Sequence, residues 1–210
     1  MASACYTRLP EGSVRLLRLL PPDPDAPSQI KCRISSFALL DSESAHAYEA
    51  LSYVWGSTVE GSGPSIAVND HEFAVTPNLY AALLHLRDAF VERVLWIDAL
   101  CINQNDDIEK GYQVQSMARI YAKANRVIVW LGEATADSGS ALRRLLEAAD
   151  TLSQEQQLHE ITFDEVQQPQ ETAFEGREQR SPVLALLARP WFRRIWVSAP
   201  NHGPSVRCAM

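Results

Sequence analysis

The sequence is poor in cysteine, and the cysteines that it has lie far apart. The 4 cysteines in 210 residues form no Cys-x-x-Cys pair, and the 5 histidines are scattered along the chain. Zinc sites are normally signalled by close Cys and His spacings. We therefore expect no metal site, and we expect free thiols, as in a protein of the reducing cytoplasm.

Long apolar runs and an excess of positive charge are also missing. No stretch approaches the roughly 20 residues that cross a membrane, and the N-terminus has no apolar segment of the signal-peptide kind. The chain carries 19 Lys and Arg against 26 Asp and Glu, a formal net charge of -7. Neither a membrane span nor a nucleic-acid partner is therefore expected.

What the sequence does contain is a regular succession of segments between residues 94 and 131. Residues 94–100 form a short apolar run with one charged residue, Asp98, and such a run is typical of a strand covered on both faces. A polar segment precedes a helix-period segment from 108 to about 123, and a second apolar run covers 127–131. Strand, loop, helix and strand in this order make a βαβ unit, which predicts an α/β fold with a partly parallel central sheet flanked by helices.

Three more strands are expected before this unit. Residues 13–20 are mostly apolar, residues 30–40 alternate in part between apolar and polar side chains, and residues 48–55 form the third. The predicted architecture is thus a single α/β domain with a small β-hairpin region in its N-terminal half.

The hairpin and a helix are expected between residues 65 and 90. Asn69 and Asp70 tolerate the positive φ of a tight hairpin turn. Thr76 suits the N-cap of the following helix, and Pro77 suits its first turn. One apolar stripe of this helix is expected to be buried, and its members are Leu79, Leu83, Leu86 and Phe90.

Residues 13–197 are expected to form the domain, after a tail of residues 1–12. A helix is predicted at 141–152, and the Gln- and Glu-rich segment 153–180 predicts a polar insertion or linker. Residues 198–210 differ in composition from the rest of the chain and predict a loose tail with nothing to pack.

Ligands of open α/β sheets bind beyond the carboxyl ends of the strands, where the connecting loops leave. Three such strand ends are predicted here, and if the strands are neighbours, the residues that follow them share one crevice. The common motifs G-x-G-x-x-G, P-loop and G-x-S-x-G do not occur. The candidate ligand-binding residues are Ser52, Tyr53, Trp55, Gly56, Cys101, Asn103, Gln104, Asp106, Gln113, Gly132 and Glu133.

Asp98 is a lone carboxylate in an apolar run, and burying an ion is costly unless it is bonded or paired. It is a candidate acid–base or ligand-binding residue. The alternative is a structural acceptor for backbone N–H groups, for example those of residues 103–105, and buried polar groups are usually satisfied in this way. Cys101 has no histidine close in sequence to activate it as a nucleophile.

Glu109 is the second candidate catalytic residue. It lies three residues after Asp106, the spacing of a capping box in which Glu109 accepts from the N–H of Asp106. That structural interpretation is favoured because caps are common. Gln113 lies one turn further along the same face. The helical period of the following residues predicts four core positions, Val114, Met117, Ala118 and Tyr121.

Three segments resemble the signature blocks of the heterokaryon-incompatibility (HET) domain of filamentous fungi. They are YEALSYVWG at 48–56, LWIDALCINQND at 95–106 followed by EKGYQVQSMARIYAKA at 109–124, and RPWFRRIW at 189–196. The resemblance covers most of residues 14–196 in family order.

The resemblance implies an effector of non-self recognition between fusing hyphae that triggers programmed cell death. Such domains are often coupled to nucleotide-binding or repeat domains. The implied partners are therefore other HET-type proteins, nucleotide-binding or repeat proteins, or further copies of the chain, and the implied mode of action is protein assembly.

The HET family also resembles Toll/interleukin-1 receptor (TIR) domains, which implies a TIR-like or flavodoxin-like sheet. Some TIR domains cleave NAD with a glutamate. A TIR-like NAD glycohydrolase with Asp98 or Glu109 in its pocket is therefore an alternative function, and NAD is the implied substrate; no other cofactor is implied.

The sequence departs from the family pattern after Val197. The family usually continues with a Gln-Glu pair, whereas this chain has Ser198, Ala199 and Pro200. A truncated or mis-spliced gene product explains such a tail. An inactive fragment is therefore the third function to consider.

Overall fold

The computed structural model describes residues 6–38, 48–56, 63–158, 182–193 and 205–209. The chain forms two compact units, one made by residues 1–133 with 195–210 and the other by residues 134–194. All of the described strands belong to the first unit.

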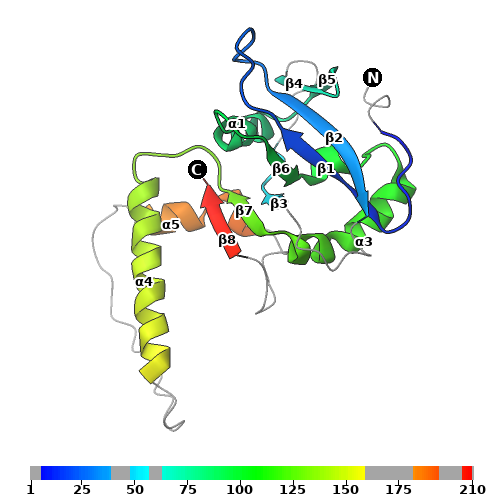
Figure 1. Cartoon of the computed structure of the whole chain (residues 1–210). Helices are drawn as coiled ribbons and strands as arrows, with labels where there is room; N and C mark the ends of the chain where they lie inside the picture. The colour runs from blue at the N-terminus through cyan, green and yellow to red at the C-terminus, as the bar shows by residue number, and fades with distance from the viewer. Residues whose placement is uncertain (1–5, 39–47, 57–62, 159–181, 194–204, 210) are drawn as a thin grey trace. The chain divides into compact units, whose positions relative to one another are not determined.

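A mixed sheet forms the centre of the first unit (Figure 1). In the described residues it has eight strands in the order β5-β4-β2-β1-β6-β3-β7-β8. β1 pairs antiparallel with β2 and β6, whereas β6, β3, β7 and β8 run parallel. This confirms the predicted α/β fold with a partly parallel sheet. The strands are β1 (Ser13–Leu19), β2 (Lys31–Ala38), β3 (Glu49–Ser52), β4 (Ser65–Val68), β5 (His71–Ala74), β6 (Arg93–Trp96), β7 (Arg126–Trp130) and β8 (Ser205–Ala209).

The first two strands follow from their hydrophobic patterns. β1 is buried along nearly its whole length, which explains its four aliphatic residues, Val14, Leu16, Leu17 and Leu19. At the start of β2, Ile30 and Cys32 are buried while Arg33 is exposed, as expected of successive residues on opposite faces of a strand. The strands predicted at 13–20 and 30–40 are thus confirmed.

β4 and β5 form the predicted hairpin. Asn69 and Asp70 occupy its turn with φ angles of 49° and 65°. The Asn69 side chain also bonds the backbone of β2, since its Oδ1 accepts from the N–H of Ile34 at 2.9 Å and its Nδ2 donates to the Ile34 carbonyl at 3.3 Å. One residue therefore allows the turn and attaches the hairpin to the next strand.

Helix α1 (Pro77–Leu86) begins as predicted, because the Thr76 hydroxyl accepts from the N–H of Leu79 at 3.2 Å. The stripe containing Leu79 and Leu86 is buried. The helix ends at Leu86, however, so Phe90 lies in the following connection and is 90% exposed. The prediction for Phe90 was wrong because the helical period was continued beyond the end of the helix.

The strand predicted at 94–100 is shorter than expected. β6 ends at Trp96, and a single helical turn, α2 (Asp98–Cys101), follows. The N–H groups of Leu100 and Cys101 both donate to the Ile97 carbonyl, at 3.0 Å and 2.7 Å. An apolar sequence suits a buried helical turn as well as a buried strand, so hydrophobicity alone did not separate the two.

Helix α3 (Asp107–Lys123) is capped by Asp106, as predicted. The Asp106 carboxylate accepts from the N–H groups of Ile108 and Glu109 at 3.1 Å and 3.0 Å. The cap therefore fixes where the helix begins after the polar loop.

The face of α3 that packs on the sheet differs from the predicted one. Val114 and Ala118 are exposed, so their assignment to the core was wrong, whereas Met117 and Tyr121 are partly buried against the core as predicted. The fully buried residues of the helix are Gln113 and Ile120.

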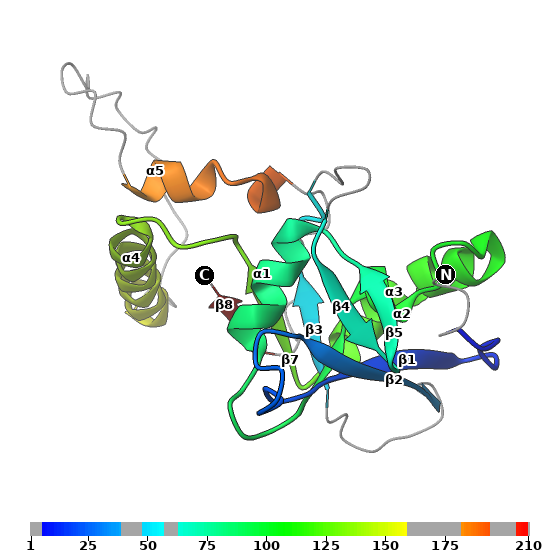
Figure 2. The ribbon, with the colours of Figure 1, turned by 90° about the horizontal axis from the view of Figure 1, so that it is seen from above.

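α1 and α3 cover opposite faces of the parallel strands (Figure 2). Trp96 of β6 pairs with Ala50, which also pairs with Val127 of β7. Trp130 lies three residues beyond Val127 and so points to the other face. Tyr121 of α3 packs edge-on against Trp96, and the Trp130 indole donates to Asn78 of α1 at 2.8 Å.

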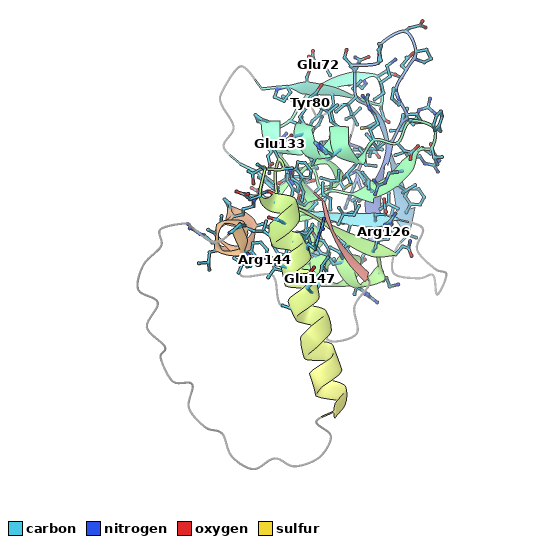
Figure 3. The ribbon with its side chains drawn as sticks, turned by 90° about the vertical axis from the view of Figure 1, so that its left-hand side faces the viewer. Glu72, Tyr80, Arg126, Glu133, Arg144 and Glu147 are labelled. Carbon is cyan, nitrogen blue, oxygen red and sulfur yellow. The ribbon has the colours of Figure 1, made fainter. Side chains whose placement is uncertain are left out.

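A charged cluster lies where the parallel strands begin. Glu49 of β3 bonds Arg93 of β6, at 2.7 Å to Nε and 2.5 Å to Nη2, and it also bonds Arg126 of β7. Figure 3 shows Arg126 well away from Glu133, which follows the opposite end of β7. The cluster therefore joins the three central strands at the end of the sheet remote from the predicted crevice.

The second unit is helical in its described part. Helix α4 (Ser138–Leu158) extends beyond the predicted 141–152, and α5 (Pro182–Leu187) is followed by a 3-10 turn at Pro190–Arg193. Arg189 donates to the Ser138 hydroxyl at 2.8 Å, which ties the two helices together. Most of the predicted polar insertion lies outside the described residues. No helix in the described part of the chain has the length and apolarity to cross a membrane.

The end of the chain contains an element that was not predicted. Ser205–Ala209 form β8, which pairs parallel with all five residues of β7. The prediction of a loose tail with nothing to pack was therefore wrong for these residues. The short alternation in SVRCA was missed because strands of five residues carry little periodic signal.

The cap of α3 gives a stability prediction. Asp106→Ala should lower the free energy of unfolding by about 1 kcal/mol, since two N–H groups lose their acceptor. Gln115→Ala, an exposed substitution on the same helix, is the control and should change stability little. Urea denaturation measures both, and an unchanged Asp106→Ala variant would contradict the capping role.

Candidate functional site

A buried ion pair lies between β1 and α3. Arg15 is 1% exposed although it carries a charge, and four of the seven residues of its strand are aliphatic. Its guanidinium binds the Glu109 carboxylate in a two-pronged contact, Nη1 to Oε1 at 2.5 Å and Nη2 to Oε2 at 2.9 Å. This geometry is the strongest that arginine and a carboxylate form.

Arg15 and Glu109 also bond three other parts of the chain: the residues before β1, helix α2, and the loop between α2 and α3. Arg15 donates to the carbonyls of Cys101 at 3.2 Å and Thr7 at 2.6 Å, and its guanidinium carbon lies 4.9 Å from the centre of the Tyr6 ring. Glu109 Oε1 accepts from the N–H of Asn103 at 2.8 Å. Residues close to the N-terminus, the α2–α3 loop, β1 and α3 thus converge on one pair of charges.

The predicted capping box is only half present. Asp106 caps α3, but Glu109 reaches back to the N–H of Asn103 rather than to that of Asp106. The reason is Arg15, which draws the carboxylate toward β1. Gln113 does not complete a crevice with Glu109 either, since it is buried and donates to the Ser13 carbonyl at 2.9 Å.

Asp98 is nearly buried at the start of α2. Its Oδ2 accepts from the Trp55 indole N–H at 3.0 Å, and its Oδ1 accepts from the N–H of Ala99 at 2.8 Å. The Gln104 amide donates to the Asp98 backbone carbonyl at 2.9 Å. Asp98 therefore connects the loop after β3 to the turn after β6, as the predicted meeting of strand ends requires.

A cavity of about 220 Å³ lies at this meeting point. It is enclosed by the loop after β3, the β5–α1 junction, the α2–α3 region and Tyr6. Its lining is mainly apolar, and the side chains of Thr76, Gln104 and Asn105 add hydrogen-bonding groups. The lining residues are Tyr6, Tyr53, Trp55, Phe73, Ala74, Val75, Thr76, Leu79, Ala99, Leu100, Gln104 and Asn105.

The structure brings together part of the predicted crevice. Tyr53, Trp55 and Gln104 line the cavity, and Asp98 lies behind Trp55. The other candidates are not lining residues, and Gly132 and Glu133 follow β7 beyond it. β7 lies on the far side of β3 from β6, which explains why its end does not reach the space between the β3 and β6 loops. The candidates that do not line the cavity are Ser52, Gly56, Cys101, Asn103, Asp106, Glu109, Gln113, Gly132 and Glu133.

Burial keeps Cys101 in its neutral form. Desolvation, with a smaller contribution from the nearby Asp98, raises the pKa of the Cys101 thiol to about 12. The pKa of the buried Cys32 thiol is also raised to about 12, by burial first. Since the thiolate is the nucleophile, neither cysteine is poised for covalent catalysis.

Two features of the site were not predicted from the sequence. They are the apolar residues that line the cavity, and Arg15. Phe73, Leu79 and Leu100 look like ordinary core residues, so no signal distinguished them. The argument that singled out Asp98 does not identify Arg15, because the same strand holds a second arginine, Arg18, whose side chain is 43% exposed.

The site offers shape, stacking surface and a few hydrogen-bonding groups. No carboxylate, histidine or cysteine is among the described residues that line the cavity. Within the described part of the chain, no cluster of three or more His, Cys, Asp or Glu side chains could hold a metal ion.

Fold and site together define an α/β domain with a mixed sheet, a buried arginine–glutamate pair and a small apolar cavity beside the β3 and β6 loops. The model of one protein family, described as heterokaryon incompatibility protein (HET), matches residues 48–198. The chain belongs to this family.

A curated relative supports the assignment. The heterokaryon incompatibility protein 6, OR allele, of Neurospora crassa is 33% identical over 180 residues. The match covers 71% of this chain but 26% of the relative, so the chain spans about a quarter of that protein's length. No solved structure matches the chain.

The thiols give a first prediction for the site. In the native protein, iodoacetamide should leave Cys101 and Cys32 unmodified, because the folded state holds both protons more tightly than the unfolded chain does. The raised pKa of each thiol in the folded state adds to the free energy of unfolding. This contribution is fully present below the pKa of about 9 of the unfolded chain, and it is lost as the pH rises toward the folded-state pKa of about 12. Site-resolved mass spectrometry with and without denaturant measures the labelling, and rapid native modification of Cys101 would contradict its burial.

The ion pair gives a second prediction. Glu109→Leu should destabilise the fold by about 3–5 kcal/mol, because it leaves the Arg15 charge buried without its partner. Arg15→Met combined with Glu109→Leu should cost less, since no lone charge remains. The control is Glu92→Leu, which breaks the exposed Arg18–Glu92 pair and should cost at most about 1 kcal/mol. Equal losses for Glu109→Leu and Glu92→Leu in chemical denaturation would contradict the central role of the pair.

Proposed function

We propose that the chain is an effector domain of fungal heterokaryon incompatibility that triggers cell death through protein assembly rather than through catalysis. Membership of the HET family and the likeness to the Neurospora crassa protein support the first part of this proposal. The chemistry of the site supports the second part.

The observation that carries the proposal is that both candidate catalytic carboxylates are engaged in structural bonds. Glu109 is held by Arg15 and by the N–H of Asn103, with its side chain 10% exposed. Asp98 is held by Trp55 and by the N–H of Ala99. A general base or nucleophile must reach its substrate, and neither carboxylate lines the cavity.

The size of the cavity favours the same conclusion. At about 220 Å³ it is smaller than the roughly 300–1,000 Å³ of most small-molecule sites. A whole dinucleotide exceeds this space, whereas an amino-acid side chain of a partner fits it.

Cleavage of NAD by a TIR-like mechanism is the second candidate. It is favoured by one observation, the position of Trp55 as an aromatic lining residue whose indole bonds a buried aspartate. That mechanism would stack the nicotinamide ring on Trp55 and would require Asp98 to leave its bond with the indole and turn into the cavity.

The partners that we propose are other HET-type proteins, nucleotide-binding or repeat proteins, and further copies of this chain. The chain corresponds to about a quarter of its curated relative, which leaves room in such proteins for sensing regions. An effector that works by contact needs a surface to present.

The proposal is tested by induced expression of the chain in a filamentous fungus, with viability as the measurement. We expect cell death from the native chain and equal death from Asp98→Asn, because asparagine removes the charge and keeps one oxygen to accept from the Trp55 indole, losing only the bond from the N–H of Ala99. Purified native protein incubated with NAD should release no nicotinamide above the buffer rate.

Two outcomes would contradict this function. Nicotinamide release that is lost in Asp98→Asn, together with loss of killing, would establish the enzyme instead. Absence of killing by a folded and abundantly expressed chain would remove the effector role altogether.

A further inference from the structure

Helix α3 turns large apolar side chains to solvent. Ile108 is 75% exposed and Tyr112 is 67% exposed, and their four-residue spacing places them on the same side of the helix. The residues that this helix buries completely are Gln113 and Ile120. A helix that covers a glutamine and exposes isoleucine and tyrosine departs from the usual amphipathic arrangement.

The exposed residues form a continuous stripe along the whole helix. Positions 108, 111, 112, 115, 118, 119 and 122 recur at three- and four-residue spacings, which places them on one side of an α-helix. All of them are exposed. We call this stripe the α3 face, and its members are Ile108, Gly111, Tyr112, Gln115, Ala118, Arg119 and Ala122.

The two halves of the α3 face differ in size. The first half carries the bulky Ile108 and Tyr112, and the second half carries the small Ala118 and Ala122. A side chain added at Gly111 would meet no atom within 4 Å, so there is open space above this residue. The α3 face therefore has large side chains toward its N-terminal end and small side chains toward its C-terminal end.

The charges of the helix differ between its ends in the same way. Asp106 and Asp107 lie at its start, and Lys123 lies in its last turn, with Arg119 one turn before it. An antiparallel copy of the same helix would bring the basic end of one over the acidic end of the other. It would also place the two helix dipoles in opposite directions.

We infer that the α3 face is a self-association surface, on which a second copy of the chain docks with its own α3 antiparallel about a two-fold axis near Gln115. In this arrangement Ile108 of one chain lies over Ala122 of the other, Tyr112 lies over Ala118, and the Arg119 stem covers the open space at Gly111. Each contact occurs twice, as a two-fold interface requires.

Self-complementarity is what selects a second copy over another partner. A partner of unrelated sequence would need small residues opposite Ile108 and Tyr112, large residues opposite Ala118 and Ala122, and charges of the opposite sign. A second, antiparallel copy of α3 supplies all of these. A face of seven residues on a helix of 17 residues is smaller than the interface of most stable dimers, so the dimer should be weak and should depend on concentration. That dependence suits an effector that is silent until copies are brought together, and in this respect the inference rests on the proposed function.

The first test compares substitutions on and off the α3 face in the full chain. Tyr112→Glu and Ile108→Glu should each raise the dimer dissociation constant at least about 30-fold, the loss typical of a central interface side chain. Phe90→Glu is the control, since Phe90 is more exposed than either but lies in the connection after α1. Sedimentation equilibrium measures the dissociation constant, and thermal melts establish that all three variants are folded.

The second test determines the orientation by disulfide cross-linking, in a chain whose Cys5 and Cys208 are replaced by serine. Gln115→Cys should cross-link to itself, because it lies at the two-fold axis. Ile108→Cys should not, because the two copies would lie about 21 Å apart at 1.5 Å per residue. A mixture of Ile108→Cys and Ala122→Cys chains should form the mixed disulfide.

Each contrary outcome overturns the inference and leaves the proposed function separately testable. A chain that stays monomeric up to about 1 mM but kills on expression has its partner elsewhere. A dimer unaffected by Tyr112→Glu, or cross-linked through Ile108→Cys alone, uses another face or a parallel arrangement. Loss of killing in Tyr112→Glu without any measurable dimer would assign the α3 face to a different protein. Dimerisation as described without killing would instead contradict the proposed effector function.

Discussion

The bidentate contact between Arg15 and Glu109 is the interaction on which the first unit depends. Without it, β1 would carry an unpaired guanidinium into the core, the loop after α2 would lose the acceptor for Asn103, and α3 would lose its attachment to the strand. Because both charges are desolvated, their removal from water costs several kcal/mol each and is offset only if every bond is made. The bonds to Thr7 and Cys101 supply most of that completion, and only the Arg15 Nε finds no acceptor among the described residues. The pair therefore specifies how the segments around it are placed more than it adds to net stability.

The order of the central strands and the cavity follow from this arrangement. β3 lies between β6 and β7, so its loop can face either neighbour. Asp98 holds it toward β6 through the Trp55 indole, while Asn78 bonds the Val54 carbonyl and the Trp130 indole from the side of α1. The space left between these attachments is the apolar cavity. A cavity bounded by so many fixed bonds is well suited to accept one rigid side chain and poorly suited to change shape during a reaction.

Much of this fold could be predicted from the sequence. The β4–β5 turn, the caps at Thr76 and Asp106, and the strand, helix and strand between 94 and 131 all leave local signals of residue type or period. The errors arose at residues whose structure is decided by contacts with residues distant in the sequence and not by the local pattern. Asp98 was expected at the end of a strand and instead begins a helical turn, and Val114 was expected in the core because nothing local indicates that α3 is rotated toward the sheet by Gln113 and Ile120. The direction of Glu109 depends on Arg15, which lies 94 residues earlier in the chain, so no capping rule could predict it.

The position of β3 has a consequence for synthesis of the protein. β1 and β2 are neighbours both in the chain and in the sheet, so they can pair as soon as they leave the ribosome. β3 is made next, yet both strands that flank it come later, and the further one ends only at Trp130. The nascent chain must therefore carry β3 unpaired until β6 ends at Trp96, and paired along one edge only until β7 ends at Trp130. Pauses in translation and chaperone supply during that interval should govern how much of the protein reaches its native state.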